Sequence, residues 1–370
     1  MIPVSEPLLH DSGREYVDEC LRTSWISSEG RFIREFEQTW AAYCGMEHGV
    51  AVTSGTTALQ VAMTSLGLEP GDEVIMPTFT IISCAIAVIE AGAVPVLVDS
   101  DPRTWCMDVE QVATRITSRT RAIMPVHMYG HPVDMDPVLA LAERHDLFVV
   151  EDAAEAHGAE YKGRRAGGMG DLSCFSFYAN KIITTGEGGM VLARNAEHAE
   201  RLRSLRNLAF RDDRRFYHTE LGHNYRLTNL QAAIGLSQVE HVDEHIRRKR
   251  WMGAAYTERL ADLPQLELPV EEPWASNVYW MYGVVLADDV PFDAEEFARR
   301  LRAEGVDTRP FFIGMHEQPV LLERGLFAGE CHPVAERIAR RGLYLPSGLT
   351  LTEEQVETVC GAVRRVLQGV

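Results

Sequence analysis

Short apolar runs alternate with amphipathic segments through the first two thirds of the chain. The segment 30–43 places Phe32, Ile33, Phe36 and Trp40 at helical spacing, which predicts a helix with one buried face. Apolar runs typical of buried strands occupy residues 49–53, 72–77, 94–98, 122–126, 147–150 and 189–193, and helical patterns separate most of them. This alternation predicts a mostly parallel sheet covered by helices on both faces.

The pattern changes after about residue 250. A strand at 279–286 and helices at 294–304 and 353–366 indicate a smaller α+β unit. We therefore expect a large α/β domain over residues 1–250, including an extended arm at 1–15, and a small C-terminal domain over 251–370. Further helices are predicted at 16–23 and, as one long helix, at 227–250. The connection 208–223 is rich in Arg, Asp and aromatic residues, and a connection of that length is usually functional.

Composition narrows the function classes. The net charge of -18 argues against non-specific binding of nucleic acid or anionic membranes, both of which need a basic surface. The sequence has no apolar run long enough to span a bilayer and no N-terminal pattern of a secretion signal. Its seven cysteines are scattered, without a C-x-x-C pair, so we expect reduced thiols, no metal site and a cytoplasmic location.

The stretch 171–190 contains a single lysine, Lys181. Apolar and small residues precede it, and three glycines and two threonines follow it. Desolvation disfavours the ammonium form and lowers the pKa of a lysine, and a neutral amine can form an imine with an aldehyde. The alternative is a lysine at the end of a buried segment whose ammonium reaches solvent.

Three other polar elements are expected at the same edge of the sheet as Lys181, and two of them follow predicted strands. Residues 53–57 (Thr-Ser-Gly-Thr-Thr) form either a phosphate seat at a helix N-terminus or an ordinary helix cap. Asp152 needs a cation, such as a protonated pyridine nitrogen, or else caps the next turn. Ser176 is either a phosphate ligand or a turn serine. Together with Lys181, these elements are the groups that pyridoxal 5'-phosphate (PLP) requires.

Several longer runs carry a resemblance to a known family. They are residues 30–37, 54–58, 71–77, 125–130, 151–158, 175–181, 186–189 and 222–229. On these runs the chain resembles the DegT/DnrJ/EryC1/StrS family of PLP-dependent sugar aminotransferases along nearly its whole length. Residues 180–189, 309–312 and 315–316 resemble most the GDP-perosamine synthase branch. The resemblance implies the aspartate-aminotransferase-like fold, PLP fold type I.

The resemblance also implies the cofactor site. The residues it implies are Ser54, Gly55, Thr56, Ile81, Asp152, Glu155, Ser176, Lys181 and Asn224. Among them Asn224 reaches the cofactor of a second subunit, which implies a homodimer with shared active sites. Ile81 departs from the family, because several members place an aromatic ring there over the cofactor.

The implied reaction is transamination of a keto-sugar nucleotide, a nucleoside-diphosphate 4-keto-6-deoxyhexose, with L-glutamate as the amino donor. Lys181 and Asp152 are the catalytic residues: the lysine binds the cofactor and moves the proton, and the carboxylate keeps the ring nitrogen protonated. Candidate substrate contacts are His127, Arg215, His218, Phe311 and His316. For the phenylalanine the alternative is core packing, and for Arg215 and His218 it is a solvated loop. Two rival functions are an aminotransferase for a keto-cyclitol or another antibiotic precursor, and a non-catalytic PLP-binding regulatory protein.

Overall fold

The computed structural model describes residues 1–211 and 213–368. Its main sheet has seven strands, and β9 runs antiparallel to both of its neighbours whereas the other pairs in the sheet are parallel. In spatial order these strands are β1 (His48–Val52), β9 (Gly189–Ala193), β8 (Leu172–Ser176), β5 (Phe148–Asp152), β4 (Thr120–Ile123), β2 (Glu73–Pro77) and β3 (Val94–Val98). The mostly parallel sheet predicted from the sequence is therefore confirmed.

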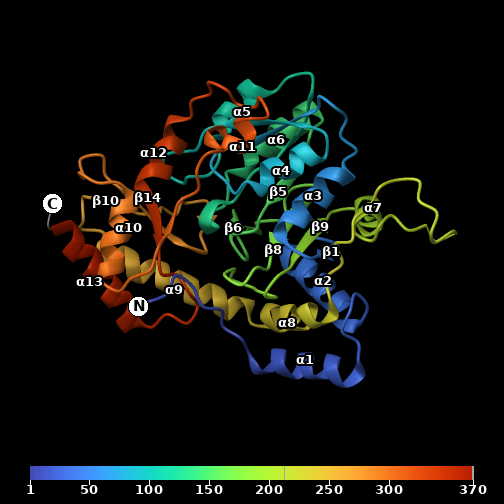
Figure 1. Ribbon diagram of the computed structural model, residues 1–370, viewed down its shortest axis with the longest axis horizontal. Coiled ribbons are helices and arrows are strands. Elements are labelled where there is room, and N and C mark those ends of the chain that lie inside the picture. Colours follow the sequence, from blue (N-terminus) through green and yellow to red (C-terminus); the bar gives the residue numbers. More distant parts are fainter. Residues whose placement is uncertain (212, 369–370) are drawn as a thin grey trace.

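Helices surround this sheet, as Figure 1 shows. They are α1 (Asp11–Thr23), α2 (Arg31–Cys44), α3 (Gly55–Ser65), α4 (Ser83–Glu90), α5 (Val109–Arg115), α6 (Met135–His145), α7 (Ala196–Arg206), α8 (Asn229–Glu240) and α9 (Val242–Leu260). The predicted apolar face of α2 is buried, because Phe32, Phe36 and Trp40 are each fully covered. One hydrophobic core joins the sheet to these helices.

A second, four-stranded sheet is antiparallel and has its own core. In spatial order it contains β10 (Leu266–Glu267), β12 (Tyr282–Leu286), β14 (Gly342–Leu345) and β13 (Arg309–Pro310). Its helices are α10 (Ala294–Ala303), α11 (Pro319–Leu322), α12 (Pro333–Arg341) and α13 (Glu353–Gln368). A small third sheet pairs β11 (Ala275–Ser276) with β6 (Glu160–Tyr161), which also pairs with β7 (Arg164–Arg165). It links the two parts of the chain.

The N-terminal segment belongs with the second sheet rather than with the first. The Ile2 amide donates to Gly305 O at 2.8 Å, and the Ser347 amide donates to Val4 O at 2.7 Å. Helix α1 then begins at Asp11, so the extended arm is shorter than the predicted 1–15 and the helix is longer than the predicted 16–23.

The predicted bounds of two other elements, the helix at 227–250 and the strand at 279–286, are wrong. The single helix expected at 227–250 is two helices, because His241 has φ -111° and ψ 10° and interrupts the α conformation. The second of them, α9, runs on to Leu260 and so crosses the expected domain boundary without a break. The strand expected from residue 279 begins at Tyr282, since Tyr279 has φ 47°, in the left-handed region where a strand cannot start.

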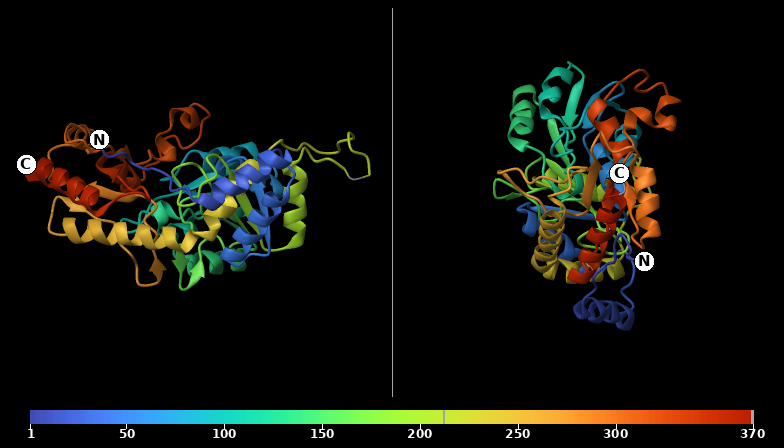
Figure 2. Two further views of the ribbon diagram at one scale, coloured as in Figure 1. Left: turned by 90° about the horizontal axis from the view of Figure 1, so that it is seen from below. Right: turned by 90° about the vertical axis from the view of Figure 1, so that its left-hand side faces the viewer.

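The connection between α7 and α8 projects from the body of the molecule. Figure 2 shows it at one end of the long axis, with both chain termini at the other. Phe216 and Leu221 on this connection are 80% and 91% exposed. Among the described helices, none is long and apolar enough to cross a membrane.

Candidate active site

Lys181 lies in the turn that follows β8. Its Nζ atom is 3.7 Å from Glu155 Oε1 and 3.6 Å from the centre of the Trp280 ring, and its side chain is 10% exposed. Burial lowers the pKa of this amine, and the nearby carboxylates of Glu155 and Asp152 oppose that shift only in part. The sequence-based expectation of a desolvated lysine agrees with this placement.

Asp152 ends β5, one strand away from the end of β8 in the parallel part of the sheet. The residue is 3% exposed. Its Oδ2 atom accepts a hydrogen bond from the Cys84 thiol at 3.0 Å, and Oδ1 accepts one from the Ala154 amide at 3.0 Å. Burial and the neighbouring Asp152 raise the pKa of the Cys84 thiol, which stays protonated and donates. In the described part of the chain, no basic side chain forms an ion pair with Asp152.

Glu155 lies between Lys181 and the backbone of Tyr129. Its Oε2 atom accepts a hydrogen bond from the Tyr129 amide at 2.9 Å. Burial raises the pKa of Glu155 to about 7, although the positive charge of Lys181 acts in the opposite direction. The Glu155 carboxyl and the Lys181 amine therefore form a buried pair whose charges depend on each other.

The N-terminus of α3 forms a narrow cradle against the end of β8. The Ser54 side chain accepts a hydrogen bond from the Thr57 amide, which leaves the amides of Gly55 and Thr56 without an acceptor inside the helix. A Cβ atom at Gly55 would lie 2.7 Å from the Ser176 Cβ, so only glycine fits there. The Thr56 hydroxyl is 2.8 Å from the Ser83 hydroxyl at the start of α4.

These residues fit PLP on observations of this structure. A buried carboxylate without a basic partner suits a protonated ring nitrogen, because an unpaired buried charge is costly. The cradle of free amides at a helix N-terminus, lined by Ser176, suits a phosphate. The buried amine of Lys181 suits an aldehyde.

We call Lys181, Asp152, Glu155 and the N-terminus of α3 the Lys181 group. Ile81 and Asn224 are not part of it. Ile81 is 42% exposed and lies two residues before Ser83, the first residue of α4, whose hydroxyl is close to that of Thr56. Asn224 is exposed and forms a backbone bridge with Asn207 at the base of the projecting connection. Neither residue forms a hydrogen bond or an ion pair with Lys181 within the described residues.

His127 is fully buried away from any opening. Its Nε2 atom is 2.9 Å from Glu151 Oε2, and Nδ1 accepts a hydrogen bond from the Val133 amide at 3.0 Å. Because both ring nitrogens are bonded inside the protein, the structure places this predicted substrate contact in the core, where it supports the loop after β4.

Phe311 and His316 are also buried. The Phe311 ring packs 4.8 Å from the ring of Tyr129, and His316 Nδ1 lies 2.7 Å from the Thr78 hydroxyl. The alternative of core packing therefore describes Phe311. His316 Nε2 is also occupied, at 3.3 Å from Glu336 Oε1.

Arg215 and His218 lie on the projecting connection. Arg215 packs 5.3 Å from the Phe210 ring and lines a surface cavity of about 430 Å³ together with Arg203, Arg206 and Arg226. His218 donates from Nδ1 to Leu208 O at 2.9 Å. In the described part of the chain, neither side chain bonds to a member of the Lys181 group.

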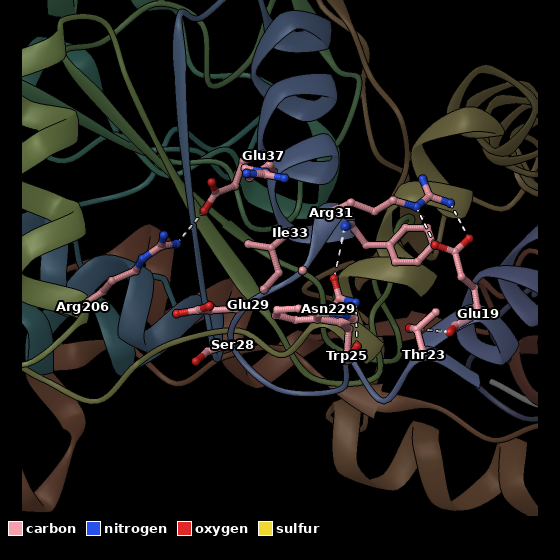
Figure 3. A pocket seen from close by; sticks show the side chains of 13 residues that line it. Glu19, Thr23, Trp25, Ser28, Glu29, Arg31, Ile33, Glu37, Arg206 and Asn229 are labelled. Carbon is pink, nitrogen blue, oxygen red and sulfur yellow. Dashed lines mark hydrogen bonds and ion pairs between the residues drawn. The ribbon is translucent and has the colours of Figure 1, made fainter. Parts of the chain in front are cut away.

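A neighbouring cavity of about 550 Å³ lies beside the loop between α1 and α2 (Figure 3). Asn229 holds this loop, since its Oδ1 accepts from the Phe32 amide at 3.1 Å and its Nδ2 donates to Trp25 O at 2.7 Å. The Arg206–Glu37 ion pair closes one side. Neither Lys181 nor Asp152 lines this cavity.

Three residues that contact the Lys181 group were not singled out from the sequence: Cys84, Tyr129 and Trp280. Cys84 is one of the seven cysteines expected to be reduced thiols, and Trp280 falls in the strand predicted at 279–286. The run 125–130 carries part of the family resemblance, but nothing in it indicates that Tyr129 has φ 50° and presents its amide to Glu155. The left-handed backbone conformation of Tyr129, and its position beside Glu155, can be seen only in the folded structure.

Comparison with known proteins gives one consistent result. Residues 8–364 match the model of the DegT/DnrJ/EryC1/StrS aminotransferase family. The chain is 45% identical to the GDP-perosamine synthase of Caulobacter vibrioides, over 99% of this chain and 98% of that protein. It is 40% identical to the GDP-perosamine synthase of Escherichia coli O157:H7, over 98% of this chain and 97% of that protein.

The fold is shared with solved structures. The crystal structure of S. venezuelae DesV in complex with a ketimine intermediate superimposes with a TM-score of 0.89 at 38% identity, covering 97% of this chain and 95% of that one. The predicted fold class, the aspartate-aminotransferase-like PLP fold type I, is confirmed.

Proposed function

Because the chain belongs to the DegT/DnrJ/EryC1/StrS aminotransferase family, which is PLP-dependent, we propose that it aminates a keto-sugar nucleotide. The proposed acceptor is a nucleoside-diphosphate 4-keto-6-deoxyhexose and the proposed donor is L-glutamate. The similarity to two GDP-perosamine synthases over almost the whole chain supports this substrate class. The observation that carries the proposal is the buried amine of Lys181 with the charge of a buried Asp152 nearby, since Asp152 forms no ion pair with a basic side chain among the described residues.

PLP would supply an aldehyde and a ring that accepts the electron pair of the donor's α-carbon. Lys181 would hold the aldehyde carbon and, once displaced by the donor, carry the proton to and from the reacting carbon. Asp152 would keep a proton on the ring nitrogen, and Glu155 would set the charge of the Lys181 amine. The amides of Gly55 and Thr56, with the hydroxyls of Ser54 and Ser176, would hold the phosphate.

We further propose that the working unit is a homodimer in which Asn224 completes the site of the partner. The exposed Phe216 and Leu221 on the projecting connection support this, as do Trp25 and Ile26, which are 55% and 45% exposed. The loop carrying Trp25 and the connection are neighbours, since Ser28 and Arg215 line the same cavity. In such a dimer the arginines of this cavity would lie near a substrate diphosphate.

A cytoplasmic location also belongs to this proposal. The seven cysteines are all free in the structure, which is typical of a reducing compartment.

The experiment adds L-glutamate to the purified, PLP-loaded protein and records the visible absorbance of the bound cofactor. We expect this absorbance to disappear with glutamate and to return when the correct keto-sugar nucleotide is added. Recovery with keto-cyclitols alone would identify the first rival function. An absorbance that glutamate does not change would identify the second rival, a regulatory protein without turnover.

A further inference from the structure

The turn that carries Lys181 is held from outside at two carbonyls, one on each side of the lysine. Trp280 donates from Nε1 to Asn180 O at 2.8 Å. His245 on α9 donates from Nδ1 to Ile182 O at 3.0 Å. The backbone around the amine is therefore fixed by side chains from α9 and from the segment before β12.

The His245 ring is itself fixed at both nitrogens. A carbonyl oxygen only accepts, so Nδ1 carries the hydrogen and Nε2 of the neutral ring is an acceptor. His10 Nε2 lies 2.8 Å from it and donates, while the His10 ring stacks on His241 at 3.7 Å. Burial lowers the pKa of His245 to about 4, so this ring is neutral at neutral pH.

Lys249 lies one turn further along the buried face of α9. The residue is 2% exposed, and its amine donates to Trp280 O at 2.7 Å and to Ser347 O. No carboxylate forms an ion pair with it in the described part of the chain. A buried amine without a carboxylate is costly, and here its polar partners are the two carbonyls.

We propose that His245 and Lys249 are positioning residues for Lys181, His245 by holding the Ile182 carbonyl and Lys249 by holding Trp280. The Trp280 indole bonds to Asn180 O and also presents its face to Nζ at 3.6 Å, where an aromatic ring attracts an ammonium group. If Lys181 leaves the cofactor and returns to it in each turnover, the backbone of its turn must stay in a fixed position. The inference rests on the proposed role of Lys181 and deepens it.

The test is hydrogen–deuterium exchange of the full chain, followed in peptides that cover residues 177–186. The Lys181 amide bonds to Tyr178 O and the Thr185 amide bonds to Phe177 O, so both report on the turn. In His245→Leu and Lys249→Met we expect their exchange to rise roughly 3- to 10-fold, which corresponds to one lost hydrogen bond. His245→Asn keeps an N–H near the position of Nδ1 and is expected to restore slow exchange.

Tyr256→Phe is the matched control on the same helix. It removes a buried hydrogen bond to Pro346 O and touches no residue of the turn. An equal rise in this control, or unchanged exchange in both test variants, would overturn the inference. If Lys249→Met does not fold, Trp280→Phe removes the indole donor to Asn180 O, together with one ring of a buried side chain, and is expected to give the same rise.

Different measurements test the role of Lys181 in turnover and the positioning role of His245 and Lys249. Turnover that survives Lys181→Ala would refute the proposed function and leave the exchange result unaffected. Where both hold, we expect the two test variants to lower kcat with L-glutamate by about 10- to 100-fold with little change in KM, because misplacement of the amine affects the reacting step. An increase in KM alone would contradict a positioning role.

Discussion

Asp152 is a buried carboxylate bonded by a thiol and a backbone amide. Neither donor carries a full charge, so the carboxylate keeps most of its capacity to stabilise a cation that enters the site. This arrangement explains how the same residue can be tolerated without cofactor and still bind a protonated ring.

Asp152→Asn tests this role. The amide has nearly the same shape but no charge to hold a proton on the ring nitrogen, so we expect kcat/KM to fall by about 10²- to 10³-fold. Steady-state kinetics with L-glutamate measure it. Cys84→Ser keeps a donor to Oδ2 and is expected to remain close to wild type; a similar loss in both variants would assign the effect to packing instead.

Glu155 and Lys181 share one buried environment at 3.7 Å. The Glu155 carboxylate favours the ammonium form and so opposes the effect of burial on the lysine. Glu155→Gln removes that opposition, and we expect the pKa of Lys181 to fall further. Labelling of the cofactor-free protein with an amine reagent at several pH values should show a midpoint at lower pH.

Peptide mapping can follow this labelling clearly, because the chain has only three lysines: Lys162, Lys181 and Lys249. Glu187→Gln changes an exposed carboxylate close in sequence and is the control. A midpoint that stays in place in Glu155→Gln would show that this carboxylate does not set the charge of Lys181.

Single candidate residues could be selected from the sequence where their chemistry is unusual for their position. A lone lysine before glycines and an aspartate after an apolar strand could be selected from the residues, and the family resemblance added Glu155. The sequence did not show that His127 is buried, because a histidine after a strand looks the same whether it faces a pocket or, as here, bonds to the buried Glu151.

Helix α9 contacts both the turn that carries Lys181 and the core of the second sheet. Its buried face carries His245 and Lys249 toward the Lys181 turn, and its C-terminal half packs in the core of the second sheet. The sequence predicted a helix here but not its extent, since the break at His241 depends on a local backbone conformation. Trp280 was missed for a related reason, because its contact with Lys181 exists only after the two parts of the chain pack together.

Burial lowers the pKa of Lys249 to about 7 from the ordinary lysine value of 10.5. Between these values the Lys249 site binds one more proton in the unfolded chain than in the folded chain, so Lys249 should contribute a rise of about 1.4 kcal/mol per pH unit to the free energy of unfolding. Lys249→Met should lack this rise. Denaturant unfolding at pH 7 to 10 measures the difference.

Lys162→Met provides the comparison for Lys249. Lys162 is half exposed and pairs with Asp136, so its removal should leave the rise in place over this pH range. A wild-type curve that runs parallel to that of Lys249→Met would mean that Lys249 stays protonated in the folded protein.

For the whole molecule, the projecting connection is the feature that a single copy does not explain. Its Phe216 and Leu221 are exposed, and its Arg215 lines a cavity that neither Lys181 nor Asp152 lines. The sequence predicted a functional connection from its length and composition, but its direction depends on how α7 and α8 are placed (Figure 1).

A hybrid dimer tests whether subunits share sites. Lys181→Ala and Asn224→Ala are each expected to be inactive or nearly so. Because an isologous dimer has two equivalent sites, refolding an equal mixture should restore about a quarter of wild-type activity, from the one intact site of each hybrid. Activity that stays at the level of the separate variants would show that Asn224 acts within its own subunit.

The central claim is that Lys181 is the residue that bonds covalently to PLP. The most direct measurement is borohydride reduction of the PLP-loaded protein, followed by peptide mapping of its three lysines. We expect the label on the peptide containing Lys181 and none on Lys162 or Lys249. A label on either of those two lysines, or no stable label at all, would contradict the account.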